Sequence, residues 1–288
     1  MAQMNAQRTY SASGVMTAVL TPMHEDLRAN IPLLAAHCWG LLEAGCSGLL
    51  LLGTTGEANS FTTSERRAIL QGVLESGIPA DRLMVGTGCC ATGDTVALTA
   101  HALSLGVRRA LVLPPFYYKK VSDDGLFDAF AADIEQIADD RLQLFVYLIP
   151  QMTGIQIGAD LMERLHAAYP KTIAGLKDSS GQWPSTQVLC QRLGAAIDVM
   201  VGTEALMLRA MAAGASGCIT ALGNVAARDI VELYRQRTTP QAAELQASLD
   251  AIRASFERES LIPALKARLA DACGEPSWRS VRPPLRSL

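Results

Sequence analysis

Short apolar runs recur along this chain about every 25 to 35 residues, and a helical pattern separates each run from the next. Runs of this length, rich in Leu, Val and Ile, are typical of strands buried on both faces of a parallel sheet. The alternation therefore predicts repeated β-α units. The expected strands are Val15–Leu20, Gly48–Leu52, Leu83–Gly86, Arg109–Leu113, Gln143–Leu148, Thr172–Lys177, Ile197–Val201 and Ser216–Thr220.

The segments between these runs carry ordinary helix signals. Thr62 and Glu65 form a capping-box pattern before a helix expected at Arg66–Ser76. The other expected helices are Asp94–Leu105, Ser122 or Asp123 to Ala138, Ala159–Tyr169, Glu204–Ala213 and Ala226–Arg237. Eight β-α units favour a closed (β/α)8 barrel, the TIM barrel, over a doubly wound sheet. The open sheet is the alternative, but Gly86-Thr87-Gly88 lacks the third glycine of its nucleotide-binding turn.

The C-terminal part of the chain departs from this repeat. Helical patterns run from Pro240 to Ala272, punctuated by Pro263, and a coil with Pro and Arg follows. We therefore expect an N-terminal tail at 1–13, a catalytic (β/α)8 barrel at 14–237 and a C-terminal helical extension at 238–288.

Composition excludes several classes of function. The net charge is −3 and the charged residues are mixed along the chain, so no basic block predicts nucleic-acid or membrane-surface binding. The apolar runs have strand length, and the N-terminus lacks an apolar signal-peptide core, so we expect no membrane span and no secretion signal. The seven cysteines are scattered, which is typical of reduced thiols in a cytoplasmic protein.

Lys177 is the lysine whose position is hardest to explain structurally. The chain has five lysines, and Lys177 alone ends an apolar strand, at Gly175-Leu176-Lys177-Asp178. A lysine is costly to bury unless it is paired or used. The C-terminal ends of the strands form the active-site face of a (β/α)8 barrel. The strand-end candidates for catalysis or substrate binding are Gly53, Thr54, Thr55, Tyr117, Tyr147, Lys177, Gly202, Glu204 and Ile219.

These strand ends offer hydroxyls and one amine, which limits the chemistry. The four histidines are dispersed, so we expect no metal site, and no cofactor motif is present. No Ser-His-Asp set or carboxylate pair gathers there. Nucleophilic catalysis by an amine remains, because a desolvated lysine is partly neutral and adds to a carbonyl group.

Several of these candidates also have a plain structural explanation. Lys177 could pair with Asp178, although adjacent strand residues point to opposite faces and Asp178 would turn outward or cap the next segment. Tyr147 could be a core residue. The segment 53–57 could be a tight turn with a positive φ at Gly56, and Tyr117 with Tyr118 could form a subunit contact.

The residues together resemble a known family. The combination of Gly53-Thr54-Thr55-Gly56-Glu57, Tyr147-x-x-Pro150 with Thr153-Gly154, and Gly175-Leu176-Lys177-Asp178 resembles the dihydrodipicolinate synthase and N-acetylneuraminate lyase family of Schiff-base-forming class I aldolases. The resemblance implies that Lys177 forms an imine with pyruvate or another 2-oxo acid and that Tyr147 is the general acid and base. Thr54 and Thr55 would bind the carboxylate and relay protons. Tyr117 would be lent to a neighbouring subunit of a homotetramer.

Other positions depart from that family pattern. Leu148 and Met152 stand where the synthase branch has an asparagine and the arginine that binds the second substrate's carboxylate. The segment 202–205 keeps one acid, Glu204, of the pair found in the sialic-acid branch, and Ala221 replaces an expected serine. These differences predict a less polar distal pocket.

The expected function is therefore a lyase or aldolase that makes or breaks a C–C bond through an enamine. A 2-keto-acid dehydratase or hydratase-aldolase is the alternative with the same chemistry. A barrel that binds a 2-oxo acid without turning it over is the alternative from another class. The second substrate and the favoured direction stay open.

Overall fold

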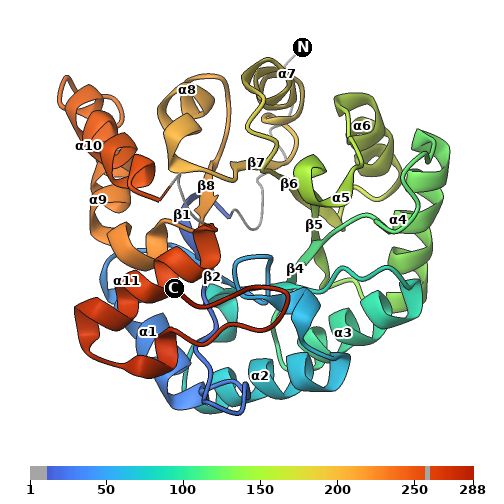
Figure 1. The fold of residues 1–288 in the computed structure, drawn as a ribbon. Coiled ribbons are helices and arrows are strands. Elements are labelled where there is room, and N and C mark those ends of the chain that lie inside the picture. Colours follow the sequence, from blue (N-terminus) through green and yellow to red (C-terminus); the bar gives the residue numbers. More distant parts are fainter. Residues whose placement is uncertain (1–11, 257–259) are drawn as a thin grey trace.

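The computed structural model describes residues 12–256 and 260–288. Eight strands close into a parallel barrel in sequence order, with β1 paired to β8, and helices surround them (Figure 1). The strands are β1 (Gly14–Ala18), β2 (Gly48–Leu51), β3 (Leu83–Gly86), β4 (Arg109–Val112), β5 (Gln143–Leu148), β6 (Ile173–Asp178), β7 (Asp198–Val201) and β8 (Gly217–Thr220). The predicted (β/α)8 barrel with a C-terminal helical extension is confirmed.

The helices alternate with the strands as expected, and two more follow the barrel. They are α1 (Ile31–Glu43), α2 (Thr63–Glu75), α3 (Thr92–Ser104), α4 (Asp123–Ile137), α5 (Pro150–Thr153), α6 (Ala159–Ala168), α7 (Trp183–Leu193), α8 (Met207–Ala212), α9 (Gly223–Arg235), α10 (Ala242–Ala254) and α11 (Leu261–Cys273). Short 3-10 turns are η1 (Ala58–Ser60), η2 (Ala80–Arg82), η3 (Glu204–Leu206) and η4 (Pro276–Trp278).

Two predicted helices differ in detail. The segment predicted as one helix, Glu204–Ala213, begins as the 3-10 turn η3 and continues as α8, because the Thr203 hydroxyl accepts from the N–H of Ala205 and tightens the first turn. The last barrel helix begins at Gly223, before the predicted Ala226, where its backbone is kinked. The capping box at Thr62 and Glu65 is present as predicted.

Alternation along the strands divides the core into two layers. Inward-facing side chains fill the barrel, and outward-facing side chains pack under the helices. The inner layer includes Met16, Leu50, Met84, Leu111, Phe145, Met200 and Ile219. Because this layer is filled by side chains, an active site has to lie above it, at the C-terminal ends of the strands.

The C-terminal extension covers part of that end of the barrel (Figure 1). α10 packs on α9 and η3, and α11 packs on α9 and η4. Pro263 lies in the first turn of α11, where no helical hydrogen bond is lost, so it does not interrupt the helix.

Parts of the domain division lie beyond what the structure describes. Nearly all of the predicted tail, 1–13, lies outside the described residues. The limits 14–237 and 238–288 remain a prediction. Among the described residues, the structure contains no helix of the length and apolar character that a membrane span requires.

Candidate active site

The register between β5 and β6 places Lys177 beside Tyr147. Leu144 pairs with Ile173, but Phe145 pairs with Gly175, so β6 contains one extra residue. Without this shift Tyr147 would pair with Leu176, whose side chain points to the other face. The bulge therefore brings Lys177 opposite Tyr147 and turns its side chain into the barrel, a known use of bulges beside active sites.

Gly175 makes this bulge possible. A Cβ atom there would lie 2.2 Å from Cε1 of Phe145 and 2.5 Å from the carbonyl oxygen of Asp198. Both distances are far below van der Waals contact, so no other residue fits without moving the strands. The lack of space for a Cβ atom therefore explains why the Gly175-Leu176-Lys177-Asp178 motif begins with glycine.

Lys177 and Tyr147 are both buried and contact each other. Lys177 Nζ donates to the Tyr147 hydroxyl at 3.2 Å and lies 4.3 Å from the centroid of its ring. Burial raises the pKa of the Tyr147 phenol, but the charge of Lys177 opposes it. Hydrogen bonds of the phenol with Thr54, Ser179 and Lys177 also lower its pKa, and the net pKa is below its ordinary value of 10.0. The phenol therefore releases a proton more readily than an ordinary tyrosine.

Asp178 faces away from this pair, as strand alternation predicts. Its Oδ1 accepts from the N–H of Ser180 at 2.8 Å, and its Oδ2 accepts from Thr186 Oγ1 of α7 at 2.5 Å. Asp178 thus fixes the loop after β6 and anchors α7. The alternative in which Lys177 serves as its structural salt-bridge partner is excluded by this orientation.

The loop after β2 brings Thr54 and Thr55 to the same place. Both threonines line the cavity that contains Lys177, and Thr54 hydrogen-bonds the Tyr147 hydroxyl. The positive φ expected at Gly56 is instead at Glu57, with φ 57°. Gly56 is needed for a different reason, since a Cβ atom there would lie 3.0 Å from the carbonyl oxygen of Val19. Gly53 supports the loop by accepting from the N–H of Ala58 and does not line the cavity.

Gly202 makes room for Ser179. A Cβ atom on Gly202 would lie 2.0 Å from Ser179 Oγ, which is one of the groups that hydrogen-bond Tyr147. The N–H of Gly202 also donates to the carbonyl of Asp178 at 2.6 Å. Gly202 lines the cavity, together with Ile219 of β8.

The cavity has a volume of about 430 Å³ and opens at the C-terminal end of the barrel. Its walls come from the ends of β5 to β8, from the loop after β2, and from Arg253, Ser260, Leu261, Ile262 and Leu285 of the C-terminal extension. Met152 and Ala221 line it, but Leu148 does not, because its side chain is buried in the outer layer. The prediction that Leu148 makes the pocket less polar is therefore wrong.

A second cavity, of about 270 Å³, lies between the segment around Arg28 and α2 and contains none of the predicted site residues.

Glu204 is close to the cavity without lining it. Its side chain is 0% exposed, and its Oε2 accepts from Thr220 Oγ1 at 2.5 Å and from Arg253 Nη2 at 2.8 Å. Arg253 Nε donates to the other oxygen, Oε1. Sequence reasoning missed Arg253, because it searched strand ends and this arginine reaches the cavity from α10. The signal in the sequence that could have pointed to Arg253 was Glu204, an acidic residue at a strand end with no evident partner.

Tyr117 is not brought to the site within one chain. It is 74% exposed on the loop before α4, packs edge-on against Tyr118, and does not line the cavity. Lys119 ties this loop to the segment after β5 by donating to the carbonyl of Thr153 at 2.9 Å.

Histidines and other possible metal ligands are dispersed. Across residues 12–256 and 260–288, no group of three His, Cys, Asp or Glu side chains is placed to hold a metal ion. His37, on helix α1, faces helix α9 and the C-terminal segment: its ring centroid lies 4.9 Å from that of Trp278, and its Nε2 lies 3.0 Å from Asn224 Oδ1.

Comparison with known proteins assigns the chain to one family. The model of the dihydrodipicolinate synthetase family matches residues 11–288. An uncharacterized DapA-like lyase of Chloroflexus aurantiacus is 35% identical over 261 residues, covering 89% of this chain and 85% of that protein. The 4-hydroxy-tetrahydrodipicolinate synthase of Aquifex aeolicus is 32% identical over 225 residues, 77% of this chain and 74% of its own length.

Solved structures agree with these sequence matches. Dihydrodipicolinate synthase from Agrobacterium tumefaciens superposes with a TM-score of 0.85 at 32% identity, covering 96% of this chain and 93% of that one. YagE, a prophage protein of the same family from E. coli solved in complex with pyruvate, superposes with a TM-score of 0.86 at 26% identity over 96% and 93% of the two chains. The chain therefore belongs to the dihydrodipicolinate synthetase family and is a lyase of that family.

Proposed function

We propose that Lys177 forms an imine with the 2-oxo carbon of pyruvate or a related 2-oxo acid, and that the enzyme makes or breaks a C–C bond through the enamine. The observation that carries this proposal is the buried contact of Lys177 Nζ with the Tyr147 hydroxyl, at 3.2 Å, in a cavity. The pyruvate bound in the related YagE structure supports the choice of 2-oxo acid.

The chemistry follows from the groups in the cavity. The neutral amine of Lys177 adds to the carbonyl carbon, and the carbonyl oxygen leaves as water once it has been protonated, which gives an iminium ion. Loss of a proton from the neighbouring methyl group gives the enamine, which attacks the carbonyl carbon of an acceptor. Water then hydrolyses the iminium and frees the product and Lys177. The reverse sequence cleaves the same bond.

Tyr147, Thr54 and Thr55 have separate roles in this scheme. Tyr147 shuttles the proton to and from the oxygen that leaves or forms, which its lowered pKa assists. Thr54 hydrogen-bonds the phenol and relays the proton. The hydroxyls and backbone N–H groups of Thr54 and Thr55 bind the carboxylate of the 2-oxo acid. The scheme uses no metal and no organic cofactor.

The presence of Met152 supports the proposal that the second substrate differs from the one used in lysine biosynthesis. It lines the cavity and is 65% exposed at a position where the resemblance would place a carboxylate-binding arginine. A dehydratase or hydratase-aldolase uses the same enamine and differs in which bond it breaks, so it remains the second candidate. High activity with aspartate semialdehyde would overturn the argument from Met152.

A homotetramer is also part of the proposal. Tyr117 and Tyr118 form an exposed aromatic pair on one loop, 74% and 73% exposed, which is the kind of surface that an interface covers. Tyr117 would enter a neighbour's site there.

The cytoplasmic location rests on the seven cysteines, all of which are free thiols.

Imine trapping tests the proposal directly. The protein is incubated with pyruvate, reduced with borohydride and weighed by mass spectrometry, and a pyruvyl adduct is expected on Lys177. The adduct should be absent from Lys177→Ala and present in Lys171→Ala, a control at an exposed lysine. No adduct with pyruvate or any other 2-oxo acid tested would refute the mechanism, and binding without an adduct would favour the non-catalytic barrel.

A further inference from the structure

We propose that Ser179 is a positioning residue of the reaction, and that its hydroxyl holds the Tyr147 oxygen as a phenolate between two proton transfers. The inference rests on the imine chemistry proposed for Lys177 and adds a residue to it. It is carried by the place of Ser179 beyond the end of β6, by its contacts there, and by the set of donors around the Tyr147 oxygen.

The ladder between β5 and β6 determines where the Ser179 side chain lies. Asp178, the last residue of β6, pairs with Leu148 of β5. The N–H of Ser179 continues this ladder by donating to the carbonyl of Leu148 at 2.8 Å. Because side chains alternate along a strand, Ser179 shares the face of Lys177 and not that of Asp178. Ser179 accordingly lines the cavity that contains Lys177 and Tyr147.

The main chain of Ser179 is held from two sides. Its N–H is bound by β5, and its carbonyl accepts from Gln151 Nε2 at 2.7 Å. Gly202, just after β7, comes so close that a Cβ atom there would lie 2.7 Å from the Ser179 Cβ and 2.0 Å from its Oγ. A hydroxyl on so fixed a backbone loses little further freedom when it holds another group in place.

Three donors converge on the Tyr147 oxygen. Lys177 Nζ donates to it at 3.2 Å. The hydroxyls of Thr54 and Ser179 hydrogen-bond it as well, from the loop after β2 and from the segment after β6. A phenol oxygen that keeps its proton has two lone pairs to offer, whereas a phenolate oxygen accepts three hydrogen bonds. The set of partners therefore suits the phenolate better than the phenol.

The proposed reaction takes Tyr147 through this ionised state. When water leaves the adduct of Lys177 and pyruvate, the C–O bond breaks, the phenol gives its proton to the departing oxygen, and the nitrogen lone pair forms the C=N bond. The phenolate then takes a proton from the methyl group, the C–H electron pair forms the C=C bond of the enamine, and the C=N electrons return to nitrogen. Between these steps the Lys177 nitrogen is bound to the substrate, so the hydroxyls of Thr54 and Ser179 hold the phenolate.

Ultraviolet titration of tyrosinate, in protein without substrate, tests the contact. The titration of Tyr147 is the difference between each protein and the same protein with Tyr147→Phe. Lys177 is the charged group that acts on this phenol. Ser179→Ala should move the titration to higher pH, because the ionised phenol loses a donor while its burial stays. Ser104→Ala, whose hydroxyl binds the carbonyl of His101 outside the site, is the matched control and should not move it. An unchanged titration in Ser179→Ala would overturn the proposal.

Exchange of the methyl protons of pyruvate for solvent deuterium measures the proton transfers without a second substrate. NMR follows the exchange at several pyruvate concentrations, which gives kcat and KM. Ser179→Ala should lower kcat about 10- to 100-fold with little change in KM, because a hydrogen bond to a charged group is lost after pyruvate has bound. Ser104→Ala should exchange at the rate of the wild type.

A double variant shows whether Ser179 acts through Tyr147. With Tyr147→Phe no phenolate can form, so adding Ser179→Ala should lower the remaining exchange far less than it lowers exchange by the wild type. An equal fold-loss in both backgrounds would contradict the proposal, since Ser179 would then act independently of the phenol.

The borohydride adduct separates this inference from the imine chemistry. A wild type that forms no adduct with pyruvate overturns the imine and, with it, the reaction that Ser179 would serve. If the adduct forms and Ser179→Ala exchanges deuterium at the rate of the wild type, the role of Ser179 alone is overturned.

Discussion

Lys266 of α11 and Glu57 of the loop after β2 form a buried ion pair, with Nζ 2.5 Å from Oε1 and the lysine side chain 0% exposed. Lys266 also donates to the carbonyl of Ser280, and the second oxygen of Glu57 accepts from the N–H of Arg282. Glu57 in turn donates its N–H to the carbonyl of Thr54. The C-terminal extension thus braces the loop that carries Thr54 and Thr55 into the active site.

Breaking this pair should be costly, because the remaining charge would be buried alone. Burial lowers the pKa of Lys266 even though Glu57 opposes the shift, so desolvation outweighs the attraction. We expect Lys266→Met to lower the free energy of unfolding by about 3–5 kcal/mol, measured by urea denaturation. Activity should fall as well, since the loop with Thr54 loses its support.

A double-mutant cycle separates the pair from the rest of the helix. Glu57→Gln with Lys266→Met removes both charges, and its loss of stability should be smaller than the sum of the two single losses. Additive losses would show that the two charges are not coupled. Arg268→Met, in the same helix, is the control for the loss of a cationic side chain.

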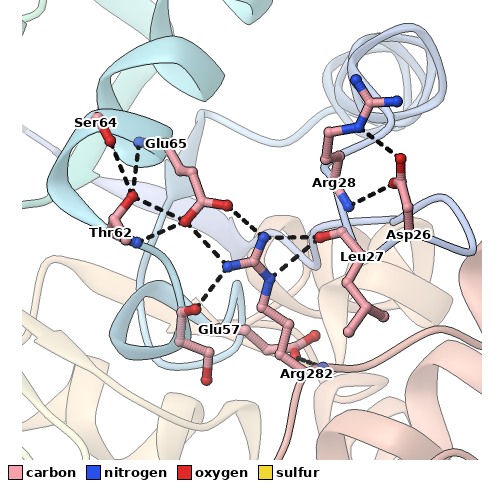
Figure 2. A network of polar contacts seen from close by, with 9 residues as sticks. Asp26, Leu27, Arg28, Glu57, Thr62, Ser64, Glu65 and Arg282 are labelled. Carbon is pink, nitrogen blue, oxygen red and sulfur yellow. Dashed lines mark hydrogen bonds and ion pairs between the residues drawn. The ribbon is translucent and has the colours of Figure 1, made fainter.

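Arg282 and Glu65 form a second link to the C-terminal segment (Figure 2). Arg282 Nη2 lies 2.5 Å from Glu65 Oε1 and also donates to the carbonyl of Leu27, while its guanidinium lies 4.0 Å from the centroid of the Phe61 ring. The hydrogen bond from Arg282 is the largest cause that lowers the pKa of Glu65 from 4.5 to about 2. The folded protein therefore binds this proton more weakly than the unfolded chain does.

The sign of this shift predicts acid lability. The stabilisation by Glu65 is fully present above pH 4.5, the ordinary pKa, and is lost as the pH falls through about 2. Glu65→Gln should therefore lower Tm at pH 7, and the difference from the wild type should disappear near pH 2. Glu75→Gln, an exposed carboxylate of the same helix bonded to Gln71, is the control. A Tm difference that does not change with pH would contradict the assignment.

Much of the fold could be predicted, because its signals are local. Apolar runs and capping residues mark each β-α unit, and Lys177 and Tyr147 lie at the ends of such runs. Lys266 was not predicted, since it lies in a helical pattern and its burial depends on a loop 209 residues away. Burial of a lysine is therefore not specific to catalysis: Lys266 meets the carboxylate of Glu57, whereas Lys177 meets the phenol of Tyr147.

Tyr147→Phe tests the proton shuttle. The ring keeps its packing, but no hydroxyl is left to transfer a proton, so kcat should fall roughly 10²- to 10⁴-fold with little change in Tm. A kcat within a few-fold of the wild type would exclude Tyr147 as the general acid and base.

The pH profile offers an independent test of Thr54. Burial raises the pKa of Tyr147, and its hydrogen bond with Thr54 is one of the interactions that lower it. If the protonated phenol is the active form, activity falls at alkaline pH as the phenol ionises. Thr54→Val should move this alkaline limb of kcat/KM to higher pH. An unchanged limb would mean that Thr54 does not act on the phenol.

Gly175→Ala tests whether the bulge in β6 positions the catalytic lysine. The new methyl group would fall 2.2 Å from the Phe145 ring and 2.5 Å from the Asp198 carbonyl, and the backbone carbonyl cannot rotate away. We expect the free energy of unfolding to fall by about 3 kcal/mol, at the upper end for an overpacked core. Where the variant folds, the strand has to shift, so Lys177 should trap pyruvate more slowly even at temperatures at which the protein is fully folded.

Gly93→Ala, at a helical glycine with no atom within 4 Å of the added Cβ, is the control and should trap pyruvate at the rate of the wild type. Wild-type trapping by Gly175→Ala would show that the β5–β6 register tolerates a side chain at this position and does not depend on glycine.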